Sequence, residues 1–269
     1  MYQRAGHISD CRTEIVSLYD HSGYALKPWA RAGYTCYAYD IANLDTNYCV
    51  DGVQYCCADL YDAESCERII ARHQGKVKLL SAFPPCTDLA ASGSKWWKRK
   101  QELDADFQRV AAERARRCAL MAEAMGCSAW YVENPVGMLS RLWRGPDAVF
   151  CPCDYGGYLH EHDAHPDYPA HIPARDAYSK RTCIWHGSRF VMPRRRRVKP
   201  TYVTYKRARN GKRSRYSPQA TLGKGSNANI ERFKRIRSVT PRGWAQAVFE
   251  ANRNGHYFEH VAYLNKRQE

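Results

Sequence analysis

The sequence predicts an α/β fold in which a mostly parallel β-sheet carries helices on both faces. Short apolar runs alternate with helical stretches over the first 190 residues, as strands joined by crossover helices do. Polar residues follow the ends of these runs, which is typical of parallel strands that end at a ligand-binding edge. The 269-residue chain is 44% hydrophobic and 12% aromatic, enough to bury a full core, so wholesale disorder is excluded.

Six apolar runs are the expected strands, and each is short and bounded by turn residues such as Pro84-Pro85, Pro135 and Gly187. Short runs with Gly or Pro at their ends favour strands over helices. In chain order the strands are Glu14 to Leu18, Thr35 to Tyr39, Val53 to Cys57, Val77 to Phe83, Trp130 to Glu133 and Thr182 to Trp185.

Three helical stretches are expected. The first passes through Pro28 to Ala32 and ends at Gly33. The longest runs from Asp104 to Met125 before Gly126, and its apolar residues fall on or near one face, which we interpret as packing against the sheet: Phe107, Val110, Ala111, Cys118, Met121 and Met125. The last, Pro241 to Asn252, follows the candidate N-cap Thr240.

The net charge of +15 is concentrated in one segment. Between Arg194 and Arg242 there are 17 Lys and Arg residues and one acid, Glu231, which is +16 in 49 residues and leaves −1 for the other 220. Such a basic segment on a nearly neutral body points to a polyanionic partner. We therefore divide the chain into a catalytic domain (1–190), a short basic nucleic-acid-binding segment (191–238) and a C-terminal helix that returns to the catalytic domain (239–269).

Within the basic segment, arginines and lysines that neutralise phosphates are interleaved with Tyr202, Tyr205 and Tyr216, which can stack or hydrogen-bond. A solvated charged loop is the alternative. Because the segment is short, we expect a short sequence context or little sequence preference. The expected nucleic-acid contacts are Arg194, Arg195, Arg196, Arg197, Lys206, Arg207, Arg209, Lys212, Arg213 and Arg215.

Twelve cysteines and an N-terminus without an apolar export signal favour reduced thiols in the cytoplasm. No apolar run approaches the ~18 residues of a membrane helix, so we expect no membrane partner. Cys151-Pro152-Cys153 is followed by His160, His162, His165 and His171. These lack the regular spacing of zinc ligands, so we expect an ordered loop over the active site and no metal.

Polar or reactive groups follow five successive strand ends. Asp40 lies 20 residues after Asp20, where a carboxylate can accept both hydroxyls of a ribose or, alternatively, cap a turn. Cys86 follows two prolines that stiffen the backbone, as a placed nucleophile requires, although it is also one thiol among twelve. Glu133 suits a buried general acid or a structural carboxylate.

Pro84-Pro85-Cys86 and Glu133-Asn134-Pro135 resemble the catalytic motifs of the cytosine-5 DNA methyltransferases. LYDHSGY, RAGY and YDI resemble that family's cofactor-binding start, and the segment from Tyr178 to Cys183 resembles its arginine-bearing strand. The tail LGKGSNANIERFKRIRSVTPRGWAQA is similar to a short phage and prophage branch of the family. The resemblance spans about residues 14 to 250. Phe83-Pro84-Pro85-Cys86 argues against amino-group methyltransferases.

The resemblance implies a Rossmann-like fold of the class I methyltransferase type and one-carbon transfer from S-adenosylmethionine to carbon 5 of a flipped cytosine in DNA. It implies that Cys86 adds covalently to the base, assisted by Glu133, Asn134 and either Lys180 or Arg181, with the register of the last two open. The implied cofactor contacts are Tyr19, Asp20, Ser22, Gly23, Asp40, Ile41, Asp59, Leu60, Phe83 and Pro85.

Three alternatives stay open. Because an enamine at carbon 5 reacts with any one-carbon electrophile, 5,10-methylenetetrahydrofolate would make the protein a DNA cytosine hydroxymethyltransferase. An RNA cytosine would be modified by the same motifs. A non-catalytic nucleic-acid-binding protein on a methyltransferase scaffold is the alternative of another class. We expect a monomer or weak dimer in the cytoplasm of a bacterium or a phage-infected host.

Overall fold

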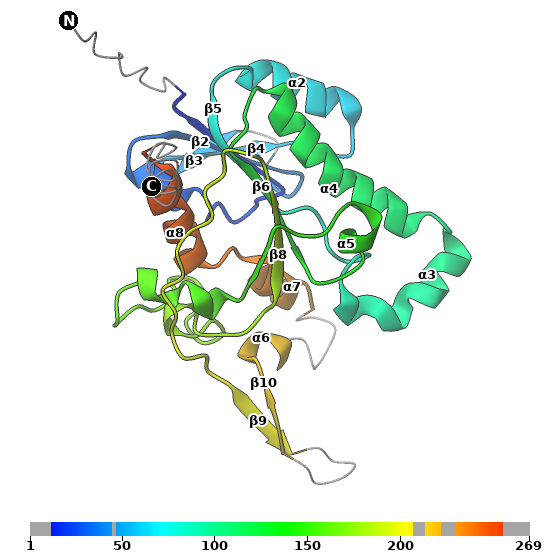
Figure 1. Ribbon diagram of the computed structural model, residues 1–269, viewed down its shortest axis with the longest axis vertical. Coiled ribbons are helices and arrows are strands. Elements are labelled where there is room, and N and C mark those ends of the chain that lie inside the picture. Colours follow the sequence, from blue (N-terminus) through cyan, green and yellow to red (C-terminus); the bar gives the residue numbers. More distant parts are fainter. Residues whose placement is uncertain (1–11, 45–46, 207–212, 222–229, 255–269) are drawn as a thin grey trace, which may run out of the picture.

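The computed structural model describes residues 12–44, 47–206, 213–221 and 230–254, and its centre is an eight-stranded sheet (Figure 1). The strand order is β3-β4-β2-β1-β5-β6-β8-β7. Strands β4, β2, β1, β5 and β6 run parallel, whereas β3, β8 and β7 pair antiparallel with their neighbours. The predicted α/β class is confirmed. From β4 to β6 the order is that of a Rossmann-like sheet, which reverses direction of growth between β1 and β5.

All six predicted strands are present, with ends that differ by at most two residues. The structure adds two three-residue edge strands, β3 and β7, which are too short to give an apolar run. The bounds are β1 Glu14–Leu18, β2 Thr35–Asp40, β3 Tyr48–Val50, β4 Val53–Cys57, β5 Val77–Ala82, β6 Trp130–Pro135, β7 Ala148–Phe150 and β8 Thr182–His186. A separate antiparallel hairpin, β9 Val203–Lys206 and β10 Arg213–Tyr216, projects from the body (Figure 1).

The three predicted helical stretches are observed as α1, α4 and α8. The predicted helix from Asp104 begins only at Phe107, because Asp104 is extended (φ −149°) and ends a separate helix, α3. The bounds are α1 Lys27–Arg31, α2 Ala63–His73, α3 Trp97–Leu103, α4 Phe107–Ala124, α5 Leu139–Leu142, α6 Pro218–Thr221, α7 Ile230–Ser238 and α8 Arg242–Asn252. Between α5 and β8 the chain holds β7 and three short 3-10 turns, Pro152–Asp154, Gly156–Tyr158 and Ala174–Asp176.

Each face of the sheet has its own apolar core. Helices α2 and α4 cover one face, where Ala115 and Met121 pack with Leu80 of β5. Helices α1 and α8 cover the other face, where Trp29 and Trp244 pack with side chains such as Tyr131 of β6. The predicted stripe of α4 is therefore core packing, except that Val110 is exposed. No helix in the described part of the chain is long and apolar enough to cross a membrane.

A buried histidine links α2 to the first two strands. His73 is fully buried, and its Nδ1 lies 2.7 Å from Glu14 Oε2 while its Nε2 lies 2.7 Å from the Tyr39 hydroxyl. Because a carboxylate only accepts, Nδ1 carries the proton and Nε2 accepts from Tyr39. Burial lowers the pKa of His73, and the bond to Glu14 opposes this.

We expect this histidine to make the fold less stable in mild acid. Its pKa in the folded state lies below its usual value, so the unfolded chain binds the extra proton and stability falls as the pH drops below about 6.5, by at most about 1.4 kcal/mol per pH unit. Urea unfolding at about pH 7.5 and about pH 5 measures this difference. His73→Gln should reduce it, and the exposed control His162→Gln should not. An unchanged difference in His73→Gln contradicts the assignment.

Candidate active site

A cavity of about 500 Å³ opens at the carboxyl ends of β1, β2, β4 and β5, which is where an open α/β sheet binds its ligands. Eight of the ten predicted cofactor contacts line it: Tyr19, Asp20, Ser22, Asp40, Ile41, Leu60, Phe83 and Pro85. Gly23 and Asp59 do not. The sequence thus located the strand-end part of the cavity.

Gly23 does not line the cavity, but it forms the turn that follows β1 beside it. Its φ is +65°, and a Cβ there would lie 2.2 Å from the Tyr55 hydroxyl, so only glycine fits. Asp59 turns its carboxylate to the backbone, where it accepts a 2.8 Å bond from the Tyr61 N–H. Asp59 therefore supports Tyr61, which does line the cavity.

Asp20 is the buried polar centre of this edge, with 3% of its surface exposed. Its carboxyl accepts bonds from the Ser17 hydroxyl (2.9 Å), the Ser22 hydroxyl (2.9 Å) and the Gly23 N–H (2.7 Å). Burial raises the pKa of Asp20, and these three bonds oppose the rise. A nearby cation would favour the charged carboxylate, so this wall of the cavity suits a positively charged ligand.

Asp40 caps a turn and also faces the cavity. It lines the cavity, and its Oδ1 accepts a 2.8 Å bond from the Ala42 N–H. This turn holds the carboxylate at the end of β2 while leaving it acceptor capacity for a ligand hydroxyl.

Other parts of the cavity come from residues that the sequence did not single out, although it predicted an ordered loop over the active site from the segment that holds Asp167 and Tyr168. Asp167 and Tyr168 belong to the loop between β7 and β8, and Tyr24 donates a bond to Asp167. Arg235, Ser238, Val239 and Thr240 come from α7 and the residues after it. The remaining additions are His21, Ala42, Ala58 and Tyr61. Of all these residues, only His21, Ala42, Ala58 and Tyr61 adjoin strand ends and could have been found from them.

The two motif loops are joined by their backbones. The Ala91 N–H donates to Val136 O (3.0 Å), and the Met138 N–H donates to Leu89 O (2.8 Å). Asn134 adds a side-chain bond, since its Nδ2 donates to Pro84 O at 3.0 Å. The loop that carries Cys86 is therefore fixed to the loop that follows Glu133.

Gly137 makes this joining possible. A Cβ at this position would lie 1.9 Å from Leu89 O. We expect Gly137→Ala to lower the free energy of unfolding by about 1–3 kcal/mol, since the backbones must separate. Gly145→Ala is the matched control, because nothing lies within 4 Å of a Cβ there. Urea unfolding of both variants measures the effect, and equal stability in the two would contradict it.

Cys86, Glu133 and Lys180 form one electrostatic cluster. Cys86 is exposed at the surface, but the pKa of its thiol is raised, mainly because the surrounding protein keeps water from it. The negative charge of Glu133 adds to this rise, and the positive charge of Lys180 opposes it. Burial raises the pKa of Glu133, which the same lysine opposes. A protonated Glu133 also favours the Cys86 thiolate, because one negative charge is then removed from the pair.

Lys180 rather than Arg181 faces this cluster. Its ammonium donates a 3.1 Å bond to Arg237 O, whereas the exposed Arg181 acts on the thiols of Cys151 and Cys183. Neighbouring residues leading into a strand point to opposite sides. Of the two residues that the sequence left open, Lys180 is therefore the one whose charge acts on the Cys86 thiol.

The four consecutive arginines lie along the body of the protein. Arg195 and Arg197 pair with Asp154 at 3.9 and 3.2 Å, and Arg196 pairs with Glu250 at 3.4 Å. Arg194 is exposed. Three of these predicted phosphate contacts are thus partly neutralised already. To bind DNA, these three arginines would have to exchange their carboxylate partners for phosphates.

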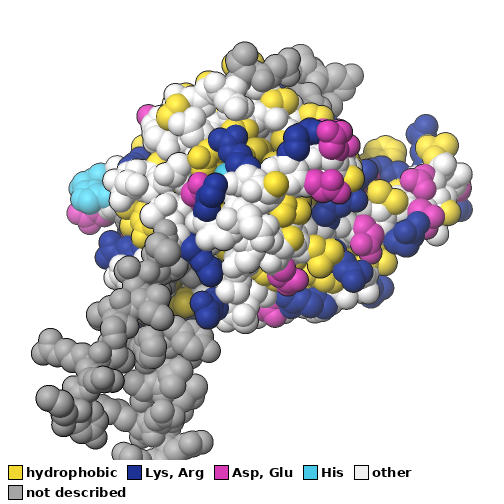
Figure 2. All heavy atoms as spheres, turned by 90° about the horizontal axis from the view of Figure 1, so that it is seen from above, with side chains coloured by type: hydrophobic (Ala, Val, Ile, Leu, Met, Phe, Trp, Pro, Cys, Tyr) yellow, Lys and Arg dark blue, Asp and Glu magenta, His cyan; other side chains and the backbone are white. Residues whose placement is uncertain are grey.

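Three of the other predicted phosphate contacts, Lys206, Arg213 and Arg215, belong to the β9–β10 hairpin. Arg213 is exposed, and the Arg215 guanidinium lies 4.4 Å from the centre of the Tyr202 ring. Lys206 ends β9, and Arg207, Arg209 and Lys212 lie outside the described residues. Figure 2 views the opposite end of the molecule, where Lys and Arg side chains are mixed with Asp and Glu rather than gathered in one patch.

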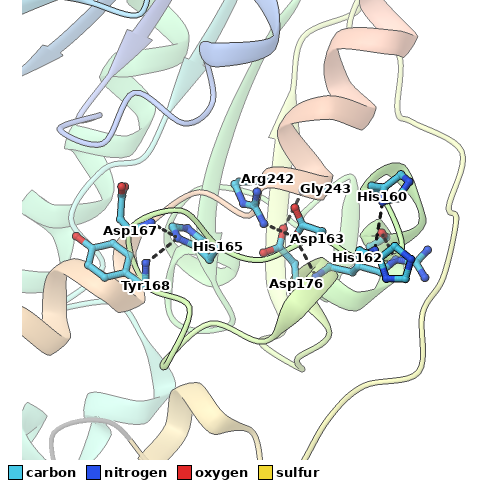
Figure 3. Close-up of polar contacts among 11 residues, drawn as sticks. His160, His162, Asp163, His165, Asp167, Tyr168, Asp176, Arg242 and Gly243 are labelled. Carbon is cyan, nitrogen blue, oxygen red and sulfur yellow. Dashed lines mark hydrogen bonds and ion pairs between the residues drawn. The ribbon is translucent and has the colours of Figure 1, made fainter.

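The Cys- and His-containing loop folds through local bonds (Figure 3). His165 Nδ1 accepts the N–H groups of Asp167 (3.2 Å) and Tyr168 (3.1 Å). Asp163 pairs with Arg242, and the buried Asp176 accepts the Gly243 N–H at 2.8 Å. Among the described residues, no group of three or more His, Cys, Asp or Glu is placed to hold a metal ion. The loop contributes to the cavity instead, through Asp167 and Tyr168.

Comparisons with known proteins add little to this geometry. No protein-family model matches the chain, and no curated protein matches it. One similar solved structure is described as a candidate DNA modification methyltransferase encoded within a prophage of E. coli. The match covers 64% of this chain and 45% of that one, with 13% identity and a TM-score of 0.34. This chain therefore spans less than half of that protein, and a likeness at this level carries no argument about function.

Proposed function

We propose that the protein transfers a methyl group from S-adenosylmethionine to carbon 5 of cytosine in DNA. The observation that carries the proposal is the cluster of Cys86, Glu133 and Lys180 beside a cavity whose wall is built from strand-end carboxylates. A placed thiol, a carboxyl with a raised pKa and a cation are the groups that addition to a pyrimidine ring requires.

The chain's own residues would act in sequence. The Cys86 thiolate forms a bond to carbon 6 of the base, and the electron pair of the ring double bond moves toward ring nitrogen 3 and carbon 5. Glu133, whose pKa is raised by burial, supplies the proton at nitrogen 3. Carbon 5 would then take the methyl group, with S-adenosylhomocysteine leaving as the demethylated donor. Water or hydroxide takes the proton from carbon 5 while the sulfur–carbon bond breaks to release the Cys86 thiolate, and nitrogen 3 returns its proton to Glu133.

Asn134 supports recognition of the base. Its Nδ2 is used by Pro84 O, but its buried Oδ1 has no hydrogen-bond partner. A buried acceptor without a partner is costly. An amino group on the edge of a cytosine would satisfy it, whereas the carbonyl at the same position of a thymine would not.

The charge of the cavity favours a cationic donor. S-adenosylmethionine, which supplies an electrophilic methyl group when bound, carries positive charges, whereas a folate tail carries carboxylates. Three acids line the cavity, Asp20, Asp40 and Asp167, against one arginine, Arg235. The buried Asp20 with its raised pKa fits a nearby positive charge. We propose Asp20, Asp40 and Asp167 as the residues that hold the donor.

Nucleoside mass spectrometry after incubation of the protein with duplex DNA tests the proposal. We expect labelled 5-methylcytosine with labelled S-adenosylmethionine and no modified base with 5,10-methylenetetrahydrofolate. Hydroxymethylcytosine formed only with the folate would overturn the donor assignment. Modification of tRNA in place of duplex DNA would overturn the substrate, and absence of product on any nucleic acid would favour a non-catalytic binding protein.

A further inference from the structure

Helix α7 lies near the start of β8 (Figure 1) and borders the cavity. Its Arg235 and Ser238 line the cavity. Ile236 is buried in a small apolar cluster with Tyr24 and Tyr178, and the carbonyl of Arg237 accepts the Lys180 ammonium at 3.1 Å. One short helix therefore contacts both the cofactor side and the catalytic side of the site.

The outer surface of α7 is strongly basic. Its nine residues include four cations, Arg232, Lys234, Arg235 and Arg237, and one acid, Glu231, for a sum of +3. All four cationic side chains are exposed. Unlike Arg195, Arg196 and Arg197, the three arginines of α7 have no ion pair with any residue that the structure describes. Uncompensated exposed cations are suited to phosphate binding.

Lys234 and Arg237 are two of the exposed cations of α7. They are three residues apart and so lie on one side of the helix. The Arg237 guanidinium is near enough to the Cys86 thiol for its charge to lower the pKa of that thiol. A cytosine seated on Cys86 brings the phosphates of its own nucleotide to this side of α7.

We propose that Lys234 and Arg237 bind backbone phosphates of the DNA strand that carries the target cytosine, and that this contact holds α7 against the cofactor cavity. The inference rests on the proposed function and adds a strand-contact surface and a coupling to it. Because α7 touches both ligands, DNA should slow the release of the cofactor product, and the cofactor product should tighten DNA binding by the same factor.

DNA binding by the variant Lys234→Gln/Arg237→Gln tests the contact. The probe is a short fluorescein-labelled duplex titrated at several salt concentrations with S-adenosylhomocysteine present. We expect weaker binding by about tenfold or more, and a slope of log affinity against log salt reduced by about 2. The control Arg68→Gln/Arg109→Gln removes two exposed charges from α2 and α4 and should lose far less. Equal losses, or an unchanged slope, would overturn the contact.

The coupling has its own readout. Unlabelled duplex should slow the dissociation of tritiated S-adenosylhomocysteine from the wild-type protein but not from the α7 double variant. In the single variant Arg237→Lys, which keeps both positive charges, the duplex should slow dissociation as it does in the wild type. No slowing in the wild type would overturn the coupling.

These outcomes separate the inference from the proposed function. If the wild type methylates DNA and the α7 double variant binds DNA as tightly as the wild type, the α7 contact is wrong and the proposed function stands. If the α7 variant loses DNA affinity as expected while no donor yields a modified cytosine, the proposed function is wrong and the contact is supported.

Discussion

Cys86→Ser is expected to abolish covalent trapping on DNA that contains 5-fluorocytosine and to lower the rate of base modification by about 10⁴-fold or more. The reason is that a thiol is a far stronger acid and a better nucleophile than a serine hydroxyl, even where burial raises its pKa as at Cys86, and Lys180 opposes that rise. The fluorine cannot leave as a proton does, so the sulfur–carbon bond persists and the adduct survives on a denaturing gel.

The matched control is Cys49→Ser, which removes another exposed free thiol from the edge strand β3. It should trap DNA as well as the wild type does. Trapping that survives in Cys86→Ser but not in Cys49→Ser would show that Cys86 is not the nucleophile. No trapping in the wild type would favour a binding protein without catalysis.

Glu133→Gln is expected to lower the rate by about 10²–10³-fold, because an amide can hydrogen-bond to ring nitrogen 3 but cannot deliver a proton to it. The pH profile gives a sharper test. Burial raises the pKa of Glu133, and the fraction of protonated Glu133 falls as the pH rises above that pKa. The fraction of Cys86 thiolate rises over the same range because the pKa of the thiol is also raised, so the wild-type rate should decline only at high pH, once the thiol is ionised and Glu133 continues to lose its proton.

In Glu133→Gln the decline at high pH should therefore disappear, and the remaining rate should follow the Cys86 thiol alone. The exposed control Glu67→Gln should keep the wild-type profile. A high-pH decline that persists in Glu133→Gln would show that another group holds the proton. Single-turnover rates measured across pH give the comparison.

Much of the fold could be predicted because each parallel strand is a local apolar run. Glu14–Leu18 and Val53–Cys57 match the predicted bounds to the residue. Edge strands such as Tyr48–Val50 were missed, since half-exposed strands of three residues give no apolar pattern. Helix α3 was also missed, because none of its residues is buried and it therefore gives no apolar stripe.

The candidate site was predicted in part for the same reason. Strand-end residues such as Asp20, Asp40 and Cys86 follow their strands directly, so finding the strands finds them. Asp167 and Arg235 reach the cavity from segments more than a hundred residues away from Asp20, and their local sequence carries no mark of that approach. The basic run from Arg194 to Arg197 was visible as charge, but its partners Asp154 and Glu250 were not.

The sequence by itself determined which residues form the central strands, which chemical groups stand at their carboxyl ends and how unevenly the charge is distributed. Only the tertiary structure decided that β8 runs antiparallel to β6, that Lys180 rather than Arg181 faces the thiol, that Gly137 lies against Leu89 and that α7 borders both halves of the site. The physical reason is range: periodicity and turn chemistry act between near neighbours, whereas these contacts join residues whose packing depends on the whole sheet.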